Sequence, residues 1–168
     1  MDSGLFVLRV VFGLLIAAHG SQKLFGWLGG YGIAGTGGFF ESLGFRPGRF
    51  FAALAGAGEF VGGVLAALGL LGPVGPALML SVMIVAAGSV HWQHGLFAAS
   101  NGIEVPLVYG AGATALALIG PGAYSVDALL GLTSLWTPTL AWAAVAIGVI
   151  GGAANLALRR PAPTTVAA

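Results

Sequence analysis

The chain has 168 residues, of which 58% are hydrophobic and only 7% are charged. Soluble domains carry roughly 25% charged residues, so this chain has too few charges to cover the surface of a water-soluble globule of its size. A net charge of +1 leaves no basic stripe for nucleic acid, and the lack of cysteine excludes disulfides, thiol redox centres and Cys-ligated metal sites. The composition therefore predicts an all-α polytopic membrane protein whose first partner is the lipid bilayer.

Five apolar stretches are long enough, or nearly so, to form helices across a hydrocarbon core that requires about 20 residues. These spans are expected at residues 5–22, 51–71, 74–91, 105–119 and 137–158. Gly72–Pro76 predicts a tight turn, so the second and third spans should form a hairpin. Arg9 interrupts the first span and no basic segment precedes it, which favours a retained helix over a signal peptide.

Two connections between the spans are long, residues 23–49 and 121–136, and each could hold a short interfacial helix. In the first of them, Phe39, Phe40 and Leu43 have the spacing of an apolar stripe on a helix that lies on the membrane surface. The tail, residues 161–168, is rich in Pro, Ala and Thr and is expected to be disordered.

The basic residues outside the spans are distributed unevenly. With five spans, all of them fall on one side of the membrane: Lys23, Arg46, Arg49, Arg159 and Arg160. The short N-terminus and the loops 72–76 and 121–136 fall on the other side and contain no Lys or Arg. Because cytoplasmic loops carry the excess of basic residues, we expect the N-terminus outside and the C-terminus in the cytoplasm.

Two charged residues lie inside the apolar spans, Arg9 in the first and Glu59 in the second. A charge near the bilayer centre costs about 2.5–3.5 kcal/mol on insertion scales and usually has a partner. At a rise of about 1.5 Å per residue, Glu59 should lie roughly 13 Å and Arg9 roughly 20 Å from the basic side. We therefore expect them to pair or to share a polar network. A structural pair, a pair lining a proton or substrate path, and no contact all stay open.

The two helices that carry these charges have faces suited to packing against each other. At about 100° per residue, one arc of the first span collects Arg9, Gly13, His19, Gly20 and Lys23. One face of the second span collects Ala52, Gly56, Glu59, Gly63 and Ala66. Small residues allow membrane helices to approach closely, so these two faces are predicted to meet.

A second group of polar residues falls at similar depth near the boundary on the basic side. It comprises His19, Lys23, His91, His94, Asn101 and Glu104. These residues could be solvated interfacial groups, or they could form a site that handles protons or binds a quinone headgroup. Metal or haem ligation is a third interpretation, because His91 and His94 at spacing i, i+3 could share an ion, but the ligand set is incomplete and no metal is expected.

Several motifs occur in a fixed order along the chain. The first span contains Arg9-x-x-x-Gly13 and His19-Gly20-x-x-Lys23-Leu24-x-Gly26, and the second contains Gly58-Glu59-x-x-Gly62-Gly63. They are followed by His94-Gly95-Leu96-Phe97, Asn101-Gly102-x-Glu104 and Gly120-Pro121-Gly122-x-Tyr124-Ser125-x-Asp127. Over roughly residues 5–127 this ordered set resembles the DoxX family of small bacterial membrane proteins. One departure is Ile103, where the family often has a tyrosine.

The resemblance implies a four-helix membrane domain over residues 1–127, with 128–160 adding a linker and a fifth helix. DoxX-like proteins are linked to membrane redox chemistry, including the DoxD-type subunit of thiosulfate:quinone oxidoreductase and the detoxification of oxidants and sulfur compounds. The resemblance therefore implies a quinone-linked oxidoreductase subunit or accessory component in the bacterial inner membrane. Two alternatives are a non-catalytic anchor or assembly subunit of a larger complex and a small transporter or channel.

Together, the buried charges, the polar group at the boundary and the resemblance give expected roles for residues. Glu59, His19 and Arg9 are the expected catalytic or proton-moving groups. The expected contacts to a quinone headgroup are Lys23, His91, His94, Asn101 and Glu104. Other membrane or redox subunits, or a second copy of the chain, are possible partners.

Overall fold

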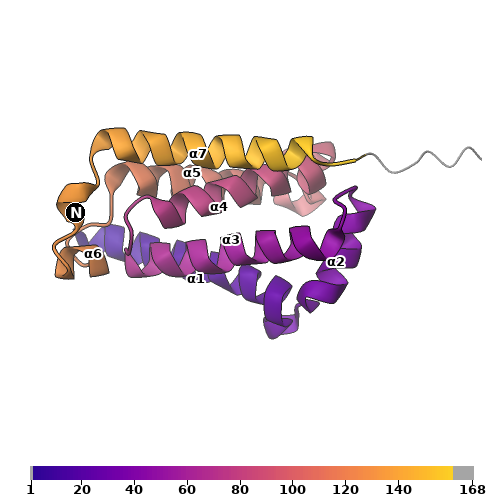
Figure 1. Ribbon diagram of the computed structural model, residues 1–168, viewed down its shortest axis with the longest axis horizontal. Helices are drawn as coiled ribbons and strands as arrows, with labels where there is room; N and C mark the ends of the chain where they lie inside the picture. The colour runs from indigo at the N-terminus through magenta and orange to yellow at the C-terminus, as the bar shows by residue number, and fades with distance from the viewer. Residues whose placement is uncertain (1, 161–168) are drawn as a thin grey trace, which may run out of the picture.

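The computed structural model describes residues 2–160, and in this part of the chain the backbone forms helices and no strand. The long helices are α1 (Asp2–Phe25), α3 (Gly48–Leu68), α4 (Val74–Ala86), α5 (Glu104–Ile119) and α7 (Pro138–Ala157), and the short ones are α2 (Gly32–Ser42) and α6 (Val126–Leu129). The long helices run along the molecule, while α2 and α6 lie at opposite ends (Figure 1). The predicted all-α polytopic bundle is confirmed. The predicted disordered tail lies outside the described residues.

Four helical segments between residues 2 and 160 are long and apolar enough to cross a membrane. They are Asp2–Phe25, Gly48–Leu68, Val74–His94 and Pro138–Ala157. The fifth, α5, is apolar but has 16 residues, in keeping with the short fourth span expected from the sequence. The protein is therefore a multi-pass membrane protein that contacts lipid.

Glycine and proline set the helix boundaries. α3 begins and ends three residues earlier than the expected span 51–71, because Pro47 is extended before its first turn and Gly69, at φ 62°, stops it in the left-handed conformation. At the start of α7, Pro138 occupies the first turn and the Thr137 hydroxyl accepts a hydrogen bond from the backbone N–H of Leu140 at 3.3 Å.

The fifth long helix is a full member of the bundle. α7 packs beside α4 and runs in the same direction, since a Cβ on Gly148 would meet Ala77 and one on Gly152 would meet Ile84. Val145 of α7 also lies in the main core. The buried residues of that core are Ile16, Ala66, Met79, Leu80, Met83, Ala113, Ala117 and Val145.

A smaller core lies at the α2 end of the bundle, formed by Phe40, Phe45, Phe51 and Ala52. A short helix does form in the connection 23–49, but its phenylalanines separate: Phe40 is buried, whereas Phe39 is exposed. The apolar face expected for a surface-lying helix is therefore partly used for packing inside the protein.

The end of α7 is bonded to the connection between α2 and α3. The backbone N–H of Arg160 donates to the Gly44 carbonyl at 2.9 Å, and Arg159 Nε donates to the Leu43 carbonyl. The C-terminal end of α7 thus lies against the connection between α2 and α3. The predicted grouping of the two basic regions at one end is confirmed. Which side of the membrane that end occupies stays a prediction.

Candidate functional site

Glycines set the register between α1 and α3. A Cβ on Gly13 would lie 2.5 Å from the Gly63 carbonyl oxygen, and a Cβ on Gly20 would overlap the backbone of Gly56 and Phe60. Substituents at these positions would force the helices apart. The predicted meeting of the two small-residue faces is confirmed. Because the helices are antiparallel, the end of α1 lies against the first half of α3.

This register brings Lys23 of α1 to Glu59 of α3. The Lys23 ammonium donates to both carboxylate oxygens of Glu59, at 2.8 and 2.6 Å. The Glu59 side chain is 4% exposed and that of Lys23 is 25% exposed. An ammonium group carries three N–H donors, and this pair uses two of them within the described part of the chain. The site is therefore a buried ion pair that is open on its lysine side.

Arg9 lies near the other end of α1 and is bound differently. Its guanidinium donates to the backbone carbonyls of Ala67 and Tyr124. It also lies 5.1 Å from the centre of the Phe6 ring, within the range of a cation–π interaction. Arg9 is 3% exposed. It joins the end of α3 to the segment after α5, which is a structural arrangement.

The predicted Arg9–Glu59 pair is therefore wrong. The depth estimate took the basic-side ends of the two helices as level, but Gly56 already lies against Leu24, near the end of α1. The first turns of α3, from Gly48 onward, extend past α1. Glu59 is consequently level with the last turns of α1, far along the helix from Arg9.

Asp127 is a second buried charge at the Arg9 end of the bundle. It is completely buried, and its carboxylate accepts hydrogen bonds from the backbone N–H groups of Leu71 at 3.0 Å and Gly72 at 2.7 Å. It also accepts a bond from the indole N–H of Trp136 at 2.7 Å. Asp127 thus connects the α3–α4 turn to the segment that leads into α7.

The predicted histidines lie where α4 loses its regular geometry. α4 continues as a π-helix over Ala87–His91 and then as a 3-10 turn over Trp92–His94. His91 Nδ1 donates to the Asn101 carbonyl at 2.8 Å, and His94 Nδ1 donates to the Val90 carbonyl at 3.0 Å. A carbonyl oxygen can only accept, so Nδ1 of each ring carries the hydrogen. The Nε2 atom of each ring has no hydrogen bond to residues 2–160.

The same connection uses Glu104 to hold its backbone. The Glu104 carboxylate accepts a hydrogen bond from the Ala98 N–H at 2.7 Å, and the Ser100 hydroxyl donates to the His94 carbonyl at 2.9 Å. Asn101, at φ 63°, completes the turn in the left-handed conformation that asparagine tolerates. The loop is thus organised by short-range hydrogen bonds.

The structure separates the predicted site residues into three places. Lys23 and Glu59 form the ion pair, with exposed His19 one helical turn before Lys23. His91, His94, Asn101 and Glu104 gather in the α4–α5 connection, while Arg9 is at the opposite end. Across residues 2–160, no hydrogen bond or ion pair joins the Lys23–Glu59 pair to the α4–α5 connection. In the same part of the chain, no cluster of three or more His, Asp or Glu residues is arranged to hold a metal.

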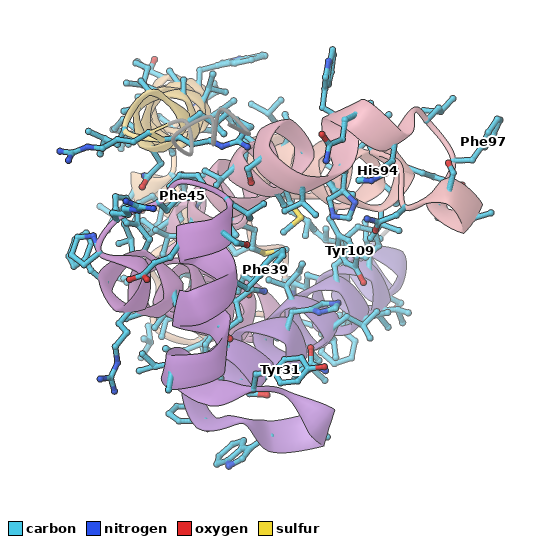
Figure 2. The ribbon with its side chains drawn as sticks, turned by 90° about the vertical axis from the view of Figure 1, so that its right-hand side faces the viewer. Tyr31, Phe39, Phe45, His94, Phe97 and Tyr109 are labelled. Atoms are coloured by element: carbon cyan, nitrogen blue, oxygen red, sulfur yellow. The ribbon has the colours of Figure 1, made fainter. Side chains whose placement is uncertain are left out.

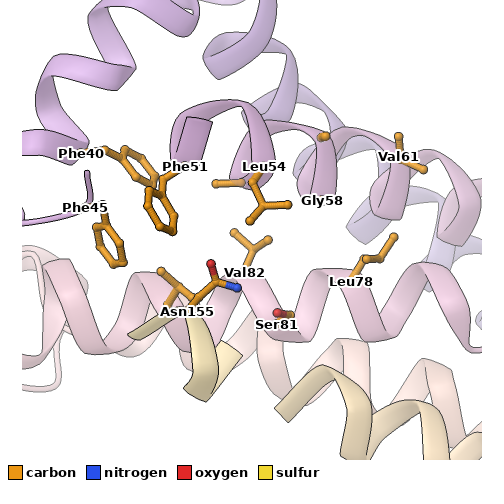
Figure 3. A pocket seen from close by; sticks show the side chains of 13 residues that line it. Phe40, Phe45, Phe51, Leu54, Gly58, Val61, Leu78, Ser81, Val82 and Asn155 are labelled. Atoms are coloured by element: carbon orange, nitrogen blue, oxygen red, sulfur yellow. The ribbon is translucent and has the colours of Figure 1, made fainter. Parts of the chain in front are cut away.

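The surface carries an apolar groove that the sequence did not predict. An apolar groove of about 340 Å3 lies between α3 and α4, with Phe40, Phe45 and Phe51 together at one end (Figure 3). Ser81 and Asn155 are its polar lining residues. They lie inside predicted spans, so polar side chains in apolar segments were the available signal.

Comparison with known proteins identifies a family. The family model of DoxX matches residues 4–92, just over half of the chain, which takes in α1 to α4 and the Lys23–Glu59 pair. The motifs from His94 onward lie beyond the matched region. No curated protein and no solved structure matches the chain.

Proposed function

The chain belongs to the DoxX family, and on that premise we propose that it is a subunit of a quinone-linked membrane oxidoreductase acting in sulfur or oxidant metabolism. The observation that supports this proposal is the Lys23–Glu59 ion pair, buried between two membrane-spanning helices. Removing two charges from water costs several kcal/mol each and is only partly recovered by their attraction. A pair kept at such a cost is a candidate for chemistry that requires charge or a proton.

The donors present fit a quinone headgroup. A quinone presents two carbonyl oxygens, which are acceptors, and when bound it supplies the capacity to take up two electrons and two protons. Lys23 has a third N–H beyond the two that it donates to Glu59, and this N–H would bind a carbonyl oxygen. Glu59 would hold the ammonium in place.

Exposed His19 would exchange protons between this pair and the surroundings. It lies four residues before Lys23 on α1, so both side chains are on one side of the helix. His91 and His94 would serve the same purpose at the boundary, because each directs Nδ1 to a carbonyl and leaves Nε2 for exchange. Asn101 and Glu104 would position these rings, and Arg9 would hold the fold at the other end.

Electrons would come from a partner subunit or from a soluble reductant, because the chain has no cysteine to relay them as thiols. We place the N-terminus outside and the C-terminus in the cytoplasm of a bacterial cell, on the basis of the basic residues that collect at one end. A non-catalytic anchor would have the same fold, so the test must separate the two functions.

The test uses membrane vesicles from cells with and without the protein, with thiosulfate or sulfite as the reductant and a short-chain ubiquinone analogue as the acceptor. We expect quinone reduction to fall when the protein is absent. We also expect it to fall in the double variant Lys23→Gln, Glu59→Gln, which keeps similar side-chain volumes without charges. Glu41→Gln, on the exposed face of α2, is the matched control and should keep full activity.

Two outcomes would contradict the proposal. If vesicles without the protein reduce quinone at the same rate, the protein has no part in this reaction. If its removal abolishes activity but the folded double variant retains it fully, the protein acts as an anchor and the ion pair is structural.

A further inference from the structure

The groove between α3 and α4 is a wedge whose shape follows from glycine placement. Near the turn, a Cβ on Gly75 would lie 2.7 Å from the Gly62 carbonyl, so the helices are in backbone contact there. One turn earlier on α3, farther from the α3–α4 turn, a Cβ on Gly58 would meet only the side chain of Val82. Beyond that point the helices diverge, and Figure 3 shows the space between them.

Aromatic rings close the wide end of the wedge. The ring centres of Phe40 and Phe45 are 5.7 Å apart, and those of Phe45 and Phe51 are 5.3 Å apart. Phe40 and Phe45 come from α2 and the segment after it, so this part of the chain forms the end wall of the groove. Figure 2 shows α2 and Phe45 at this end of the bundle. None of the described residues that line the groove is charged.

The groove opens toward the hydrocarbon of the bilayer, because α3 and the α4 segment that form its sides both have the length and hydropathy of membrane spans. Leu54 and Val61 on its lining are each 46% exposed. Its volume is within the range of sites that bind small molecules. One turn of a helix about 10 Å across and about 5.4 Å long already occupies more than this volume, whereas a single hydrocarbon chain is slender enough to lie along the groove.

Arginines lie in the segments that form the wide end. Arg46 follows Phe45, which lines the groove, and Arg159 comes four residues after Asn155, another lining residue. Arg49, in the first turn of α3, lies against Gly37 of α2 on the other face of that helix. The hydrogen bonds from Arg159 and Arg160 to the Leu43 and Gly44 carbonyls hold the end of α7 against this region. All four arginines are exposed. Glu41 is the acidic residue nearby, and one of its oxygens accepts from the Gly48 N–H at 3.1 Å.

We propose that the groove binds one acyl chain of an anionic phospholipid, with the phosphate held by Arg46 and Arg159 at the rim. The acyl chain of the lipid lies along Leu54, Val82 and Leu78. Asn155 uses one amide hydrogen on the Gly151 carbonyl at 3.0 Å, which leaves the other for an ester carbonyl of the lipid. Guanidinium groups match phosphate oxygens in charge and geometry.

The arginine rim favours this occupant over an uncharged one. A quinone tail or a neutral lipid would fill the apolar groove equally well but would gain nothing from the guanidinium groups near its wide end. Basic clusters next to membrane helices attract anionic headgroups in this way. The inference does not rest on the proposed redox function, since it concerns different residues on the opposite side of α3.

The experiment is native mass spectrometry of the full chain released from nanodiscs that contain equal amounts of phosphatidylglycerol and phosphatidylcholine with identical acyl chains. We expect about tenfold preferential retention of one phosphatidylglycerol molecule. The variant Arg46→Gln, Arg159→Gln should lose this preference, whereas Arg46→Lys, Arg159→Lys should keep part of it because the charge remains.

A second variant tests the groove itself. Val82→Phe fills the wedge and should reduce retention of the phosphatidylglycerol, while Val149→Phe, on an exposed face of α7, is the matched control and should not. Equal retention of the two lipids by the unmodified protein would overturn the proposal. So would unchanged retention by folded Val82→Phe, or a bound quinone in place of the phospholipid. If Val82→Phe does not fold, the selectivity of the arginine variant decides.

Discussion

The bundle contains two sets of buried charges that are used in different ways. At one end, Arg9 and Asp127 bind backbone carbonyls, backbone N–H groups and an indole, and neither pairs with an opposite charge within residues 2–160. Toward the other end, Lys23 and Glu59 bind each other. Both sets are desolvated, so burial alone does not distinguish a structural charge from a functional one. The two sets differ in the type of partner that they bind.

Backbone partners fix the path of the chain. Arg9 and Asp127 together join the α3–α4 turn to the segments before and after α6, and each charge meets several groups that would otherwise be unsatisfied in an apolar interior. A side-chain pair such as Lys23–Glu59 connects only two helices that glycine contacts already hold together. Its charges are therefore available for another role.

The largest effect is expected at Asp127. Asp127→Ala would leave the N–H groups of Leu71 and Gly72 and the indole of Trp136 without their acceptor in a buried site. At about 1–3 kcal/mol for each unsatisfied group, the free energy of unfolding should fall by about 3 kcal/mol or more. Detergent-to-SDS unfolding followed by circular dichroism measures this change. Asp2→Asn at the exposed start of α1 is the control, and a loss below about 1 kcal/mol at Asp127 would contradict its structural role.

Breaking the ion pair should have a smaller effect on the free energy of unfolding, and a second substitution should partly reverse it. Glu59→Gln leaves the Lys23 ammonium without its anion and should lower the free energy of unfolding by about 2 kcal/mol, less than for a fully buried pair because Lys23 is a quarter exposed. The double variant with Lys23→Gln should recover part of this loss, since two amides can bond each other. A double-mutant cycle should give a coupling of about 1–2 kcal/mol.

Additive losses in that cycle would mean that the two side chains are energetically independent. The comparison with Asp127 would then fail, because Lys23 and Glu59 would be stabilised by other partners.

The sequence predicted what depends on composition and periodicity. Apolar runs gave the helices, and the glycine faces of α1 and α3 gave their contact, because a small-residue pattern at helical spacing is a local property. The placement of the basic regions at one end followed from counting spans. The helices and the glycine faces can each be recognised within one segment of the chain, and the placement of the basic regions requires only the number of spans between them.

Features that depend on register or on backbone partners could not be predicted in this way. Arg9 binds the carbonyls of Ala67 and Tyr124, and every residue carries a carbonyl, so no residue type marks the partner. The partner of Glu59 depended on how far α3 extends past the end of α1. The groove depended on the splay between α3 and α4, which is set by where Gly62 meets Gly75.

A third polar region, the α4–α5 connection, tests whether burial or bonding controls stability. Glu104 accepts a backbone hydrogen bond as Asp127 does, but it is exposed. Glu104→Ala should lower the free energy of unfolding by only about 0.5–1 kcal/mol, because water can replace the lost acceptor. The same unfolding measurement gives this value, with Glu41→Ala as a second exposed acceptor for comparison. A loss as large as that at Asp127 would show that the bond, rather than its burial, sets the cost.

The smallest effect on stability is expected at His19, where a larger effect on activity is expected. His19 is exposed and makes no hydrogen bond to residues 2–160, so His19→Gln should change the free energy of unfolding by less than about 0.5 kcal/mol. If His19 exchanges protons with the Lys23–Glu59 pair, quinone reduction in vesicles should nevertheless fall at least about tenfold, within the range of lost acid–base catalysis. Full activity would mean that protons reach the pair without this side chain. Because the unfolding measurement is expected to show almost no change, a loss of activity here cannot be assigned to a damaged fold.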